Sequence, residues 1–299
     1  VITTIRVGVD PRNVFVDTRS NKIYIPNMGT HDVAIIDGLT NTVEYQLDLK
    51  INPRGVTVSP KNNRIYATTS RNLLLAISHV DYSIQSIIPV GSDIADVTVG
   101  GDTIYVSSSG DDTVYAVDTK TEAIIATVPV GHFPRGLGLN SRNRRLYVAN
   151  GGDNTVSVID TKTNAVISTI TVGNDPRLVG VNPNTNTVYV ANKGDGTVSV
   201  IDSRQNRVRK VITVGNQPRG VAVNNVTNKI YVANGEDDTV SVIDGTNNSV
   251  IDTVTVGDEP RDITVNTTIN KIYAGNYSSN SVSVIDGLTD DVFSEVAVG

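Results

Sequence analysis

Cysteine and tryptophan are absent from this sequence of 299 residues, and methionine occurs once. Without cysteine the chain cannot form disulfides, thiolate metal sites or a cysteine nucleophile. Three histidines are present, His31, His79 and His132, and they lie far apart along the chain. This spacing argues against a histidine-based metal or haem centre. The composition therefore predicts a protein without a cofactor or metal ion.

Long apolar runs and an excess of positive charge are also missing. No run approaches the roughly 20 residues that span a bilayer. The formal net charge is −6, so no global basic field attracts the chain to nucleic acid. No signal peptide is visible, and the repeat pattern is already under way at Val1, which is typical of a mature or trimmed fragment. We expect neither a membrane span nor a nucleic-acid partner.

What the sequence does contain is a repeat of 42 residues, shortened to 39 at one step. Its clearest marker is a tyrosine that follows Ile, Leu or Val. These tyrosines are Tyr24, Tyr66, Tyr105, Tyr147, Tyr189, Tyr231 and Tyr273. A period of this length governs the fold, because each repeat is one unit that packs on its neighbours.

Each repeat holds four short runs in which apolar and polar residues alternate. In residues 214–255 these runs are RGVAV, KIYVAN, TVSVID and SVIDTVTV. Such β-branched runs predict half-buried strands, and the Asn- and Gly-rich clusters between them predict hairpin turns. Four antiparallel strands in each of seven repeats predict an all-β fold, the seven-bladed β-propeller. A β-solenoid would need shorter repeats.

Residues 1–299 are expected to form a single domain. The blades are expected at residues 8–49, 50–89, 90–129, 130–171, 172–213, 214–255 and 256–299. Two runs compete to be the last strand of the seventh blade, VITTIRV at residues 1–7 and VFSEVAV at residues 292–298. We favour the C-terminal run because it follows its own blade directly, and residues 1–7 are the alternative closing strand.

The repeated YVAN…TVSVID text resembles the YVTN-type β-propeller repeat, and the resemblance extends from Val7 to Gly299. That family occurs in archaeal surface-layer proteins and in bacterial periplasmic or secreted proteins. The resemblance implies a location at the cell surface, outside the cell or in the periplasm. It is specific for fold and weak for function, because propellers carry many functions.

An arginine follows proline at the start of the first strand in six of the seven repeats. These residues are Arg12, Arg54, Arg135, Arg177, Arg219 and Arg261. The first strand of a blade lines the central channel, so the guanidinium groups should ring the channel mouth and favour a carboxylate, phosphate or sulfate. Alternatively, acids of the same face, such as Asp175 and Glu259, pair with these arginines and leave no site.

Blades two and three depart most from the repeat. Blade two has LLLAIS in place of TVSVID, and blade three has Ala95–Asp96 in place of Pro-Arg and the short turn GGD. Drift accounts for such changes, since loops tolerate changes in length. The alternative is that this edge meets a partner.

Aspartates close the third strand of six repeats. They are Asp37, Asp118, Asp160, Asp202, Asp244 and Asp286. A ring of carboxylates could suit calcium or acid–base chemistry. Each one precedes a turn, however, and aspartate caps turns through its own side chain. We interpret these aspartates as turn caps.

Two basic clusters are expected on the face opposite the arginine ring. The first comprises Arg142, Arg144 and Arg145, and the second comprises Arg204, Arg207, Arg209 and Lys210. They could contact an acidic polymer, but few aromatic residues lie nearby to stack on bases. Solvated charge is the simpler interpretation.

No hydrolase, metalloprotease or phosphate-loop motif occurs in the sequence. The predicted channel face is repetitive, whereas propeller enzymes place singular polar residues there. We therefore expect a non-catalytic extracytoplasmic interaction or scaffold module, not an enzyme, with a protein or cell-surface polymer as partner. One alternative is an anion- or acidic-polymer-binding protein that uses the arginine ring. Another is a propeller-type hydrolase or lyase.

Overall fold

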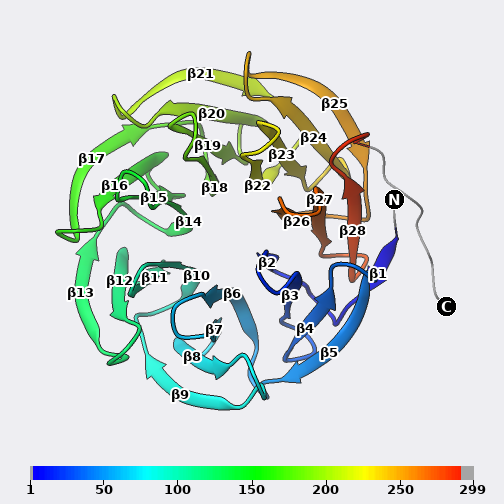
Figure 1. Ribbon diagram of the computed structural model, residues 1–299. Coiled ribbons are helices and arrows are strands. Elements are labelled where there is room, and N and C mark those ends of the chain that lie inside the picture. The colour runs from blue at the N-terminus through cyan, green and yellow to red at the C-terminus, as the bar shows by residue number, and fades with distance from the viewer. Residues whose placement is uncertain (1–2, 291–299) are drawn as a thin grey trace.

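Seven four-stranded antiparallel sheets surround a central channel in the computed structural model, which describes residues 3–290. Figure 1 shows the sheets as the blades of a ring, each with one strand at the centre and one at the rim. The described part of the chain contains strands and turns but no helix. The predicted all-β, seven-bladed propeller is therefore confirmed.

The strands are numbered in chain order. The innermost strands are β2 (Phe15–Asp17), β6 (Pro53–Ser59), β10 (Ile94–Gly100), β14 (Pro134–Asn140), β18 (Pro176–Asn182), β22 (Pro218–Asn224) and β26 (Pro260–Asn266). The second strands are β3 (Lys22–Asn27), β7 (Arg64–Thr69), β11 (Thr103–Ser108), β15 (Arg145–Asn150), β19 (Thr187–Asn192), β23 (Lys229–Asn234) and β27 (Lys271–Asn276). The third strands are β4 (Asp32–Asp37), β8 (Leu73–Ser78), β12 (Thr113–Asp118), β16 (Thr155–Asp160), β20 (Thr197–Asp202), β24 (Thr239–Asp244) and β28 (Ser281–Asp286). The outermost strands are β5 (Thr42–Asp48), β9 (Ile84–Pro89), β13 (Ile124–Pro129), β17 (Ala165–Thr171), β21 (Arg207–Thr213), β25 (Ser249–Thr255) and β1 (Thr4–Arg6).

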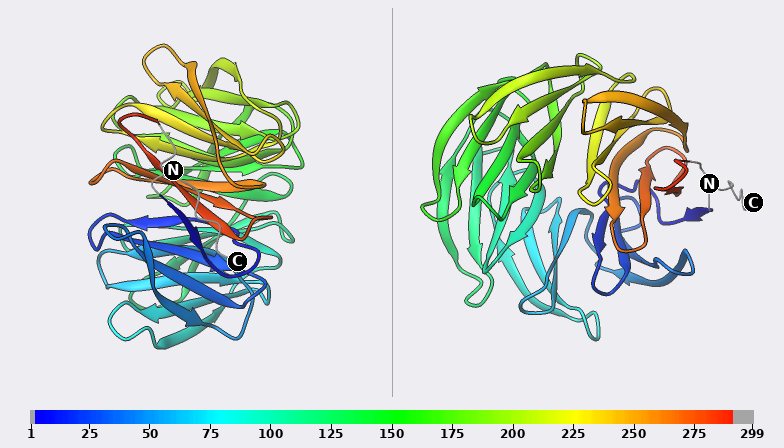
Figure 2. Two further views of the ribbon diagram at one scale, coloured as in Figure 1. Left: turned by 90° about the vertical axis from the view of Figure 1, so that its right-hand side faces the viewer. Right: turned by 45° about the horizontal axis from the view of Figure 1, so that its top comes forward.

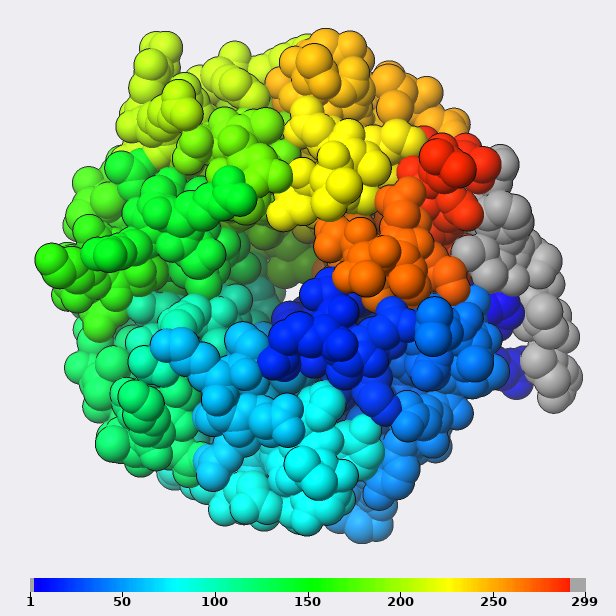
Figure 3. Space-filling view, in the orientation of Figure 1, coloured from blue at the N-terminus to red at the C-terminus, as the bar shows by residue number. Residues whose placement is uncertain are grey.

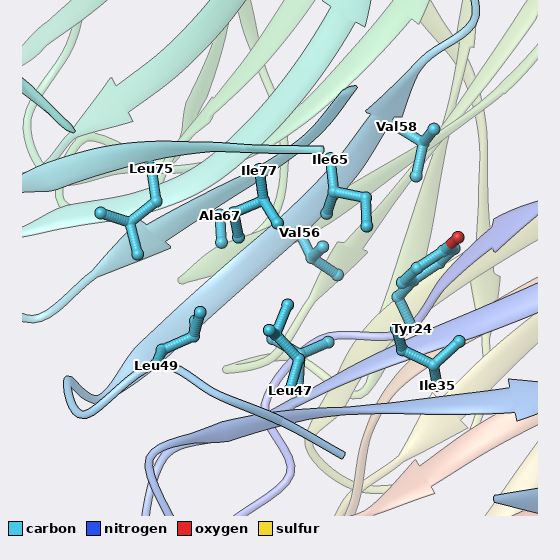
Figure 4. Packing of buried hydrophobic residues seen from close by; sticks show 11 residues of the cluster. Tyr24, Ile35, Leu47, Leu49, Val56, Val58, Ile65, Ala67, Leu75 and Ile77 are labelled. Carbon is cyan, nitrogen blue, oxygen red and sulfur yellow. The ribbon is translucent and has the colours of Figure 1, made fainter. Parts of the chain in front are cut away.

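The core lies between the blades, where the apolar faces of neighbouring sheets meet. Figure 4 shows one such layer, in which Tyr24 and Ile35 of the first blade pack against Val56 and Ile65 of the second. The seven repeat tyrosines are all at most 1% exposed. Burial of an aromatic side chain of this size stabilises the fold by about 2–3 kcal/mol. No blade can cover these faces alone, so packing between blades stabilises the ring.

The N-terminal strand closes the ring. Strand β1 pairs with β28 through Thr4 opposite Ser283 and Ile5 opposite Val282, so the last sheet has the order β1-β28-β27-β26. Figure 1 shows β1 beside β28 at the edge of the ring. The preference for residues 292–298 as the closing strand is therefore wrong, because the slot beside β28 is filled. That C-terminal run lies outside the described residues.

The ring forms a thick disc with two different faces (Figure 2). One face carries the loops that lead into the innermost strands and the loops between second and third strands, and we call it the mouth face. The opposite face carries the turns between first and second strands and between third and fourth strands. The space-filling view shows the opening at the centre of the disc (Figure 3). Within residues 3–290 no helix is long and apolar enough to cross a membrane.

Candidate functional site

The arginines of the Pro-Arg repeats gather around the channel mouth, close enough to influence one another electrostatically. Burial and then the positive charge of Arg261 lower the pKa of Arg12. Burial and then the charge of Arg177 lower the pKa of Arg135. The pKa of Arg219 falls to about 10 through burial and the charges of neighbouring arginines. Burial and mutual repulsion thus disfavour the charged form of these guanidinium groups, and an anion bound between them would relieve that repulsion.

Four of the six arginines have acidic partners. Arg177 pairs with Asp175 at 2.6 Å. Glu259 accepts hydrogen bonds from Arg261 at 2.6 Å and from Arg219 at 3.4 Å. Arg54 pairs with Asp93 of the third blade. Pairing with acids of the same face, the alternative to an anion site, therefore accounts for these four arginines.

Arg12 and Arg135 differ, because no carboxylate among residues 3–290 forms an ion pair with either one. Their Nε atoms are buried without a hydrogen-bond partner, as are those of Arg177 and Arg219, so the missing carboxylate is what sets Arg12 and Arg135 apart. Arg12 instead lies over the ring of Tyr277, 5.1 Å from its centroid. In the fourth blade, Phe133 stands before the Pro-Arg pair at the place held by Glu259 in the seventh blade, and Phe133 is 53% exposed. Arg135 thus lacks the acid that its own repeat would supply.

The break in the ring at blade three leaves room for a cavity. The expected alignment of Ala95–Asp96 with Pro-Arg is wrong by one residue, because Ile94 pairs with β11 as Pro218 pairs with β23. Ala95 therefore occupies the position that an arginine holds in the other blades, and its methyl group cannot fill the same space. A cavity of about 370 Å³ lies there, lined by Arg12, Arg54, Arg135, Ala95, Asp96 and Met28 among others. This size lies within the range of small-molecule sites. We call this cavity the mouth pocket.

Two acids line the mouth pocket: Asp93, which pairs with Arg54, and Asp96, which also lines the channel cavity below, of about 200 Å³. Asp96 Oδ2 accepts a hydrogen bond from the Leu137 amide at 2.9 Å, and its Oδ1 accepts one from the Val97 amide at 2.8 Å. Burial raises the pKa of Asp96 to about 6. A carboxyl group with this pKa is suited to general acid–base chemistry near neutral pH.

A second singular acid, Asp262, lines the channel cavity from β26. The Asp262 carboxylate accepts hydrogen bonds from the Val14 amide and from Asn13 Nδ2, both at 2.8 Å. These bonds join the seventh blade to the first at the point where the ring closes. Burial, with a further contribution from the charge of Asp96, raises the pKa of Asp262 to about 7.

The other predicted residues lie away from the mouth pocket. Each of the aspartates that close third strands caps its turn by accepting a backbone N–H; for example, Lys162 donates to Asp160 at 2.7 Å. The turn-cap interpretation is confirmed for these residues. Within residues 3–290 no group of three or more histidine or acidic side chains is placed to hold a metal ion.

The basic clusters also have structural contacts. Arg145 bonds to Asn206 at 3.0 Å, and Arg209 bonds to Thr187 at 3.1 Å. Lys210 donates to the carbonyl of Asn247 at 3.0 Å. These contacts tie the side chains to neighbouring turns and strands of the propeller.

Comparison with known proteins identifies the family. The family description "Lactonase, 7-bladed beta-propeller" matches residues 13–170, which is more than half of the chain. The chain belongs to the seven-bladed propeller lactonase family. A search of curated proteins gave no match. Hydrazine synthase from Kuenenia stuttgartiensis has a similar structure, with a TM-score of 0.82, 17% sequence identity, and coverage of 94% of this chain and 97% of that chain. At this identity the likeness concerns the fold alone.

Membership of the lactonase family corrects the expected function. A non-catalytic interaction or scaffold module was predicted because the channel face looked repetitive, yet the family is named for an enzyme. The structure shows why the sequence argument failed. Singular residues do line the channel, but Ala95 and Asp96 were interpreted as drift and Asp262 was passed over. The sequence did contain a signal for these acids. At the position directly after the repeat arginine, three blades have glycine, whereas the third and seventh blades have aspartate.

Proposed function

We propose that this member of the lactonase family is a hydrolase that opens a lactone bearing an acidic group, bound in the mouth pocket. The observation that carries the proposal is the pairing, in one cavity, of two arginines without carboxylate partners and a carboxyl group of raised pKa. Arg12 and Arg135 supply positive charge for an anionic substrate, and Asp96 supplies a base. Electrostatic stabilisation by such pre-placed charges is usually a large part of catalysis.

The reaction that these groups support is the addition of water to the lactone carbonyl. The Asp96 carboxylate takes a proton from water as its oxygen forms a bond to the carbonyl carbon. Guanidinium groups stabilise the negative charge that develops on the carbonyl oxygen. When the ring C–O bond breaks, the leaving oxygen takes the proton back from Asp96. One lactone and one water give one hydroxy acid, whose new carboxylate is an anion that the arginines favour.

The proposal predicts a specific pH profile. Because only ionised Asp96 accepts a proton, kcat/KM for an acidic lactone should rise with pH around a midpoint of about 6. In Asp96→Asn this rise should disappear together with most of the turnover, while the hydroxy-acid product still binds. The matched control is Asp252→Asn, since Asp252 is exposed on the outer strand β25. Full activity in Asp96→Asn would overturn the assignment of the base.

A comparison of acidic and neutral lactones tests whether the arginines bind the acidic group of the substrate. The double variant Arg12→Ala/Arg135→Ala should lose kcat/KM for both substrates, because both develop charge on the carbonyl oxygen, and the loss should be about tenfold or more greater for an acidic lactone than for a neutral one. Arg207→Ala serves as control, because Arg207 is exposed on β21 far from the mouth face. An equal loss for both substrates would mean that the arginines do not bind the acidic group of the substrate.

The repeat sequence also supports a proposal about the repeat type and the location of the protein. The YVAN…TVSVID pattern favours a YVTN-type repeat, and with it a location outside the cytoplasm and contact with a protein or cell-surface polymer. Fractionation of the native organism with an antibody against this chain tests the location. Recovery in the cytoplasmic fraction would refute it.

A further inference from the structure

A second cavity lies on the opposite face of the disc, at the junction of the third and fourth blades. It has a volume of about 350 Å³ and is lined by Gly100, Gly101, Tyr105, Leu139, Arg144 and Lys162 among others. The first–second strand turn of the third blade and the third–fourth strand turn of the fourth blade form its rim. It shares no lining residue with the mouth pocket. We call it the junction pocket.

The junction pocket arises from two changes that occur together. At three other junctions an asparagine at the end of the innermost strand bonds to an asparagine in the next blade. The pairs are Asn182 with Asn228, Asn224 with Asn270, and Asn266 with Asn21, at 2.6–2.8 Å. At the junction of blades three and four, Gly100 and Arg144 stand in these two positions. The bridge is therefore missing, and a space takes its place.

Arginine at position 144 departs from the residue that most blades use at this turn. Arg144 has φ +57°, in the left-handed region, and five other blades have asparagine at the equivalent turn position, for example Asn186 with φ +55°. Asparagine tolerates this conformation better than arginine does. The fold thus carries a small conformational cost here, which a functional role for the guanidinium would explain.

Positive charge at the junction pocket is not neutralised by an ion pair. Within residues 3–290, no carboxylate forms an ion pair with Arg144 or Lys162. Asp160, two residues before Lys162, caps its own turn by accepting a hydrogen bond from the Lys162 amide. Tyr105 and Leu139 add apolar surface to the walls. Two cations beside an apolar wall are complementary to an anion with a short apolar body.

We propose that the junction pocket binds a small organic anion, with its acidic group between Arg144 and Lys162 and its apolar body against Tyr105 and Leu139. The site is separate from the proposed lactonase chemistry and does not depend on it. Benzoate is a suitable probe because it joins a carboxylate to a flat apolar body. Inorganic phosphate is the matched probe that carries charge alone.

The test is a titration followed by NMR of leucine methyl groups, which distinguishes the two cavities. Leu139 lines the junction pocket, whereas Leu178 lines the mouth pocket. Benzoate should shift the Leu139 methyl signals saturably, and Arg144→Asn should weaken this binding about tenfold or more. Arg144→Asn introduces the residue that five other blades use at this turn, so the variant should fold. Arg142→Asn on the same hairpin should bind as the wild type does.

Three outcomes would overturn the proposal. The first is a benzoate titration in which only Leu178 responds, because the anion would then occupy the mouth pocket. The second is unchanged benzoate affinity in Arg144→Asn. The third is a Leu139 response to phosphate equal to the response to benzoate, because the apolar wall would then contribute nothing to recognition.

Discussion

Replacement of Asp262 by asparagine should change how the stability of the propeller depends on pH. The pKa of Asp262 rises from 3.8 to about 7 on folding. A carboxyl group with a raised pKa stabilises the folded state fully below its unfolded pKa, and this stability is lost as pH rises through the folded pKa. A shift of this size corresponds to about 4 kcal/mol. About 3 kcal/mol of this loss falls between pH 5 and pH 8.

The measurement is urea denaturation of the wild type and Asp262→Asn at pH 5 and pH 8. The wild type should lose stability across this interval, and the variant should lose about 3 kcal/mol less. The lowered pKa of His79 has the opposite effect on the free energy of unfolding, because the stability that His79 contributes is lost as pH falls. Both proteins contain His79, so the difference between them isolates Asp262. Parallel pH dependence in the two proteins would show that Asp262 keeps an ordinary pKa, and the account of its burial would be wrong.

Two further predictions concern the blade tyrosines and the mouth pocket. The Tyr189 hydroxyl bonds to Asn248 at 2.9 Å, whereas the buried Tyr147 hydroxyl has no hydrogen-bond partner. In thermal or urea denaturation, Tyr189→Phe should therefore destabilise by about 1–2 kcal/mol, and Tyr147→Phe should be neutral or stabilising; equal effects would contradict this. Phe133→Asp should give Arg135 the acid that other repeats supply, and so weaken binding of the hydroxy-acid product in calorimetry without loss of folding. Unchanged product affinity would mean that Arg135 does not contact the anion.

The repeat and its alternating runs were sufficient to predict the blades, because the same tyrosine and the same four strands recur with little change. The closing strand could not be predicted. Residues 1–7 and 292–298 carry the same alternating pattern, and only tertiary geometry decides which one pairs with β28.

The candidate site was only partly predictable for a related reason. In sequence the six arginines are equivalent, and their location around the mouth followed from the repeat. What distinguishes Arg12 and Arg135 is that no carboxylate in the described part of the chain forms an ion pair with them, whereas the other four arginines have such partners. The space beside Ala95 and the raised pKa of Asp96 depend on packing around the channel, which a linear pattern does not report.

The pairing of β1 with β28 also has a consequence for the order of folding during synthesis. Ile5 is made early and Val282 late, yet they lie opposite each other. The six other sheets are each formed by consecutive strands, so they can assemble as the ribosome releases them. Until β28 emerges, β1 has no partner, and the nascent ring stays open with apolar blade faces exposed at both ends. Such an intermediate is prone to association, so this chain should depend on chaperones most just before its last blade is complete.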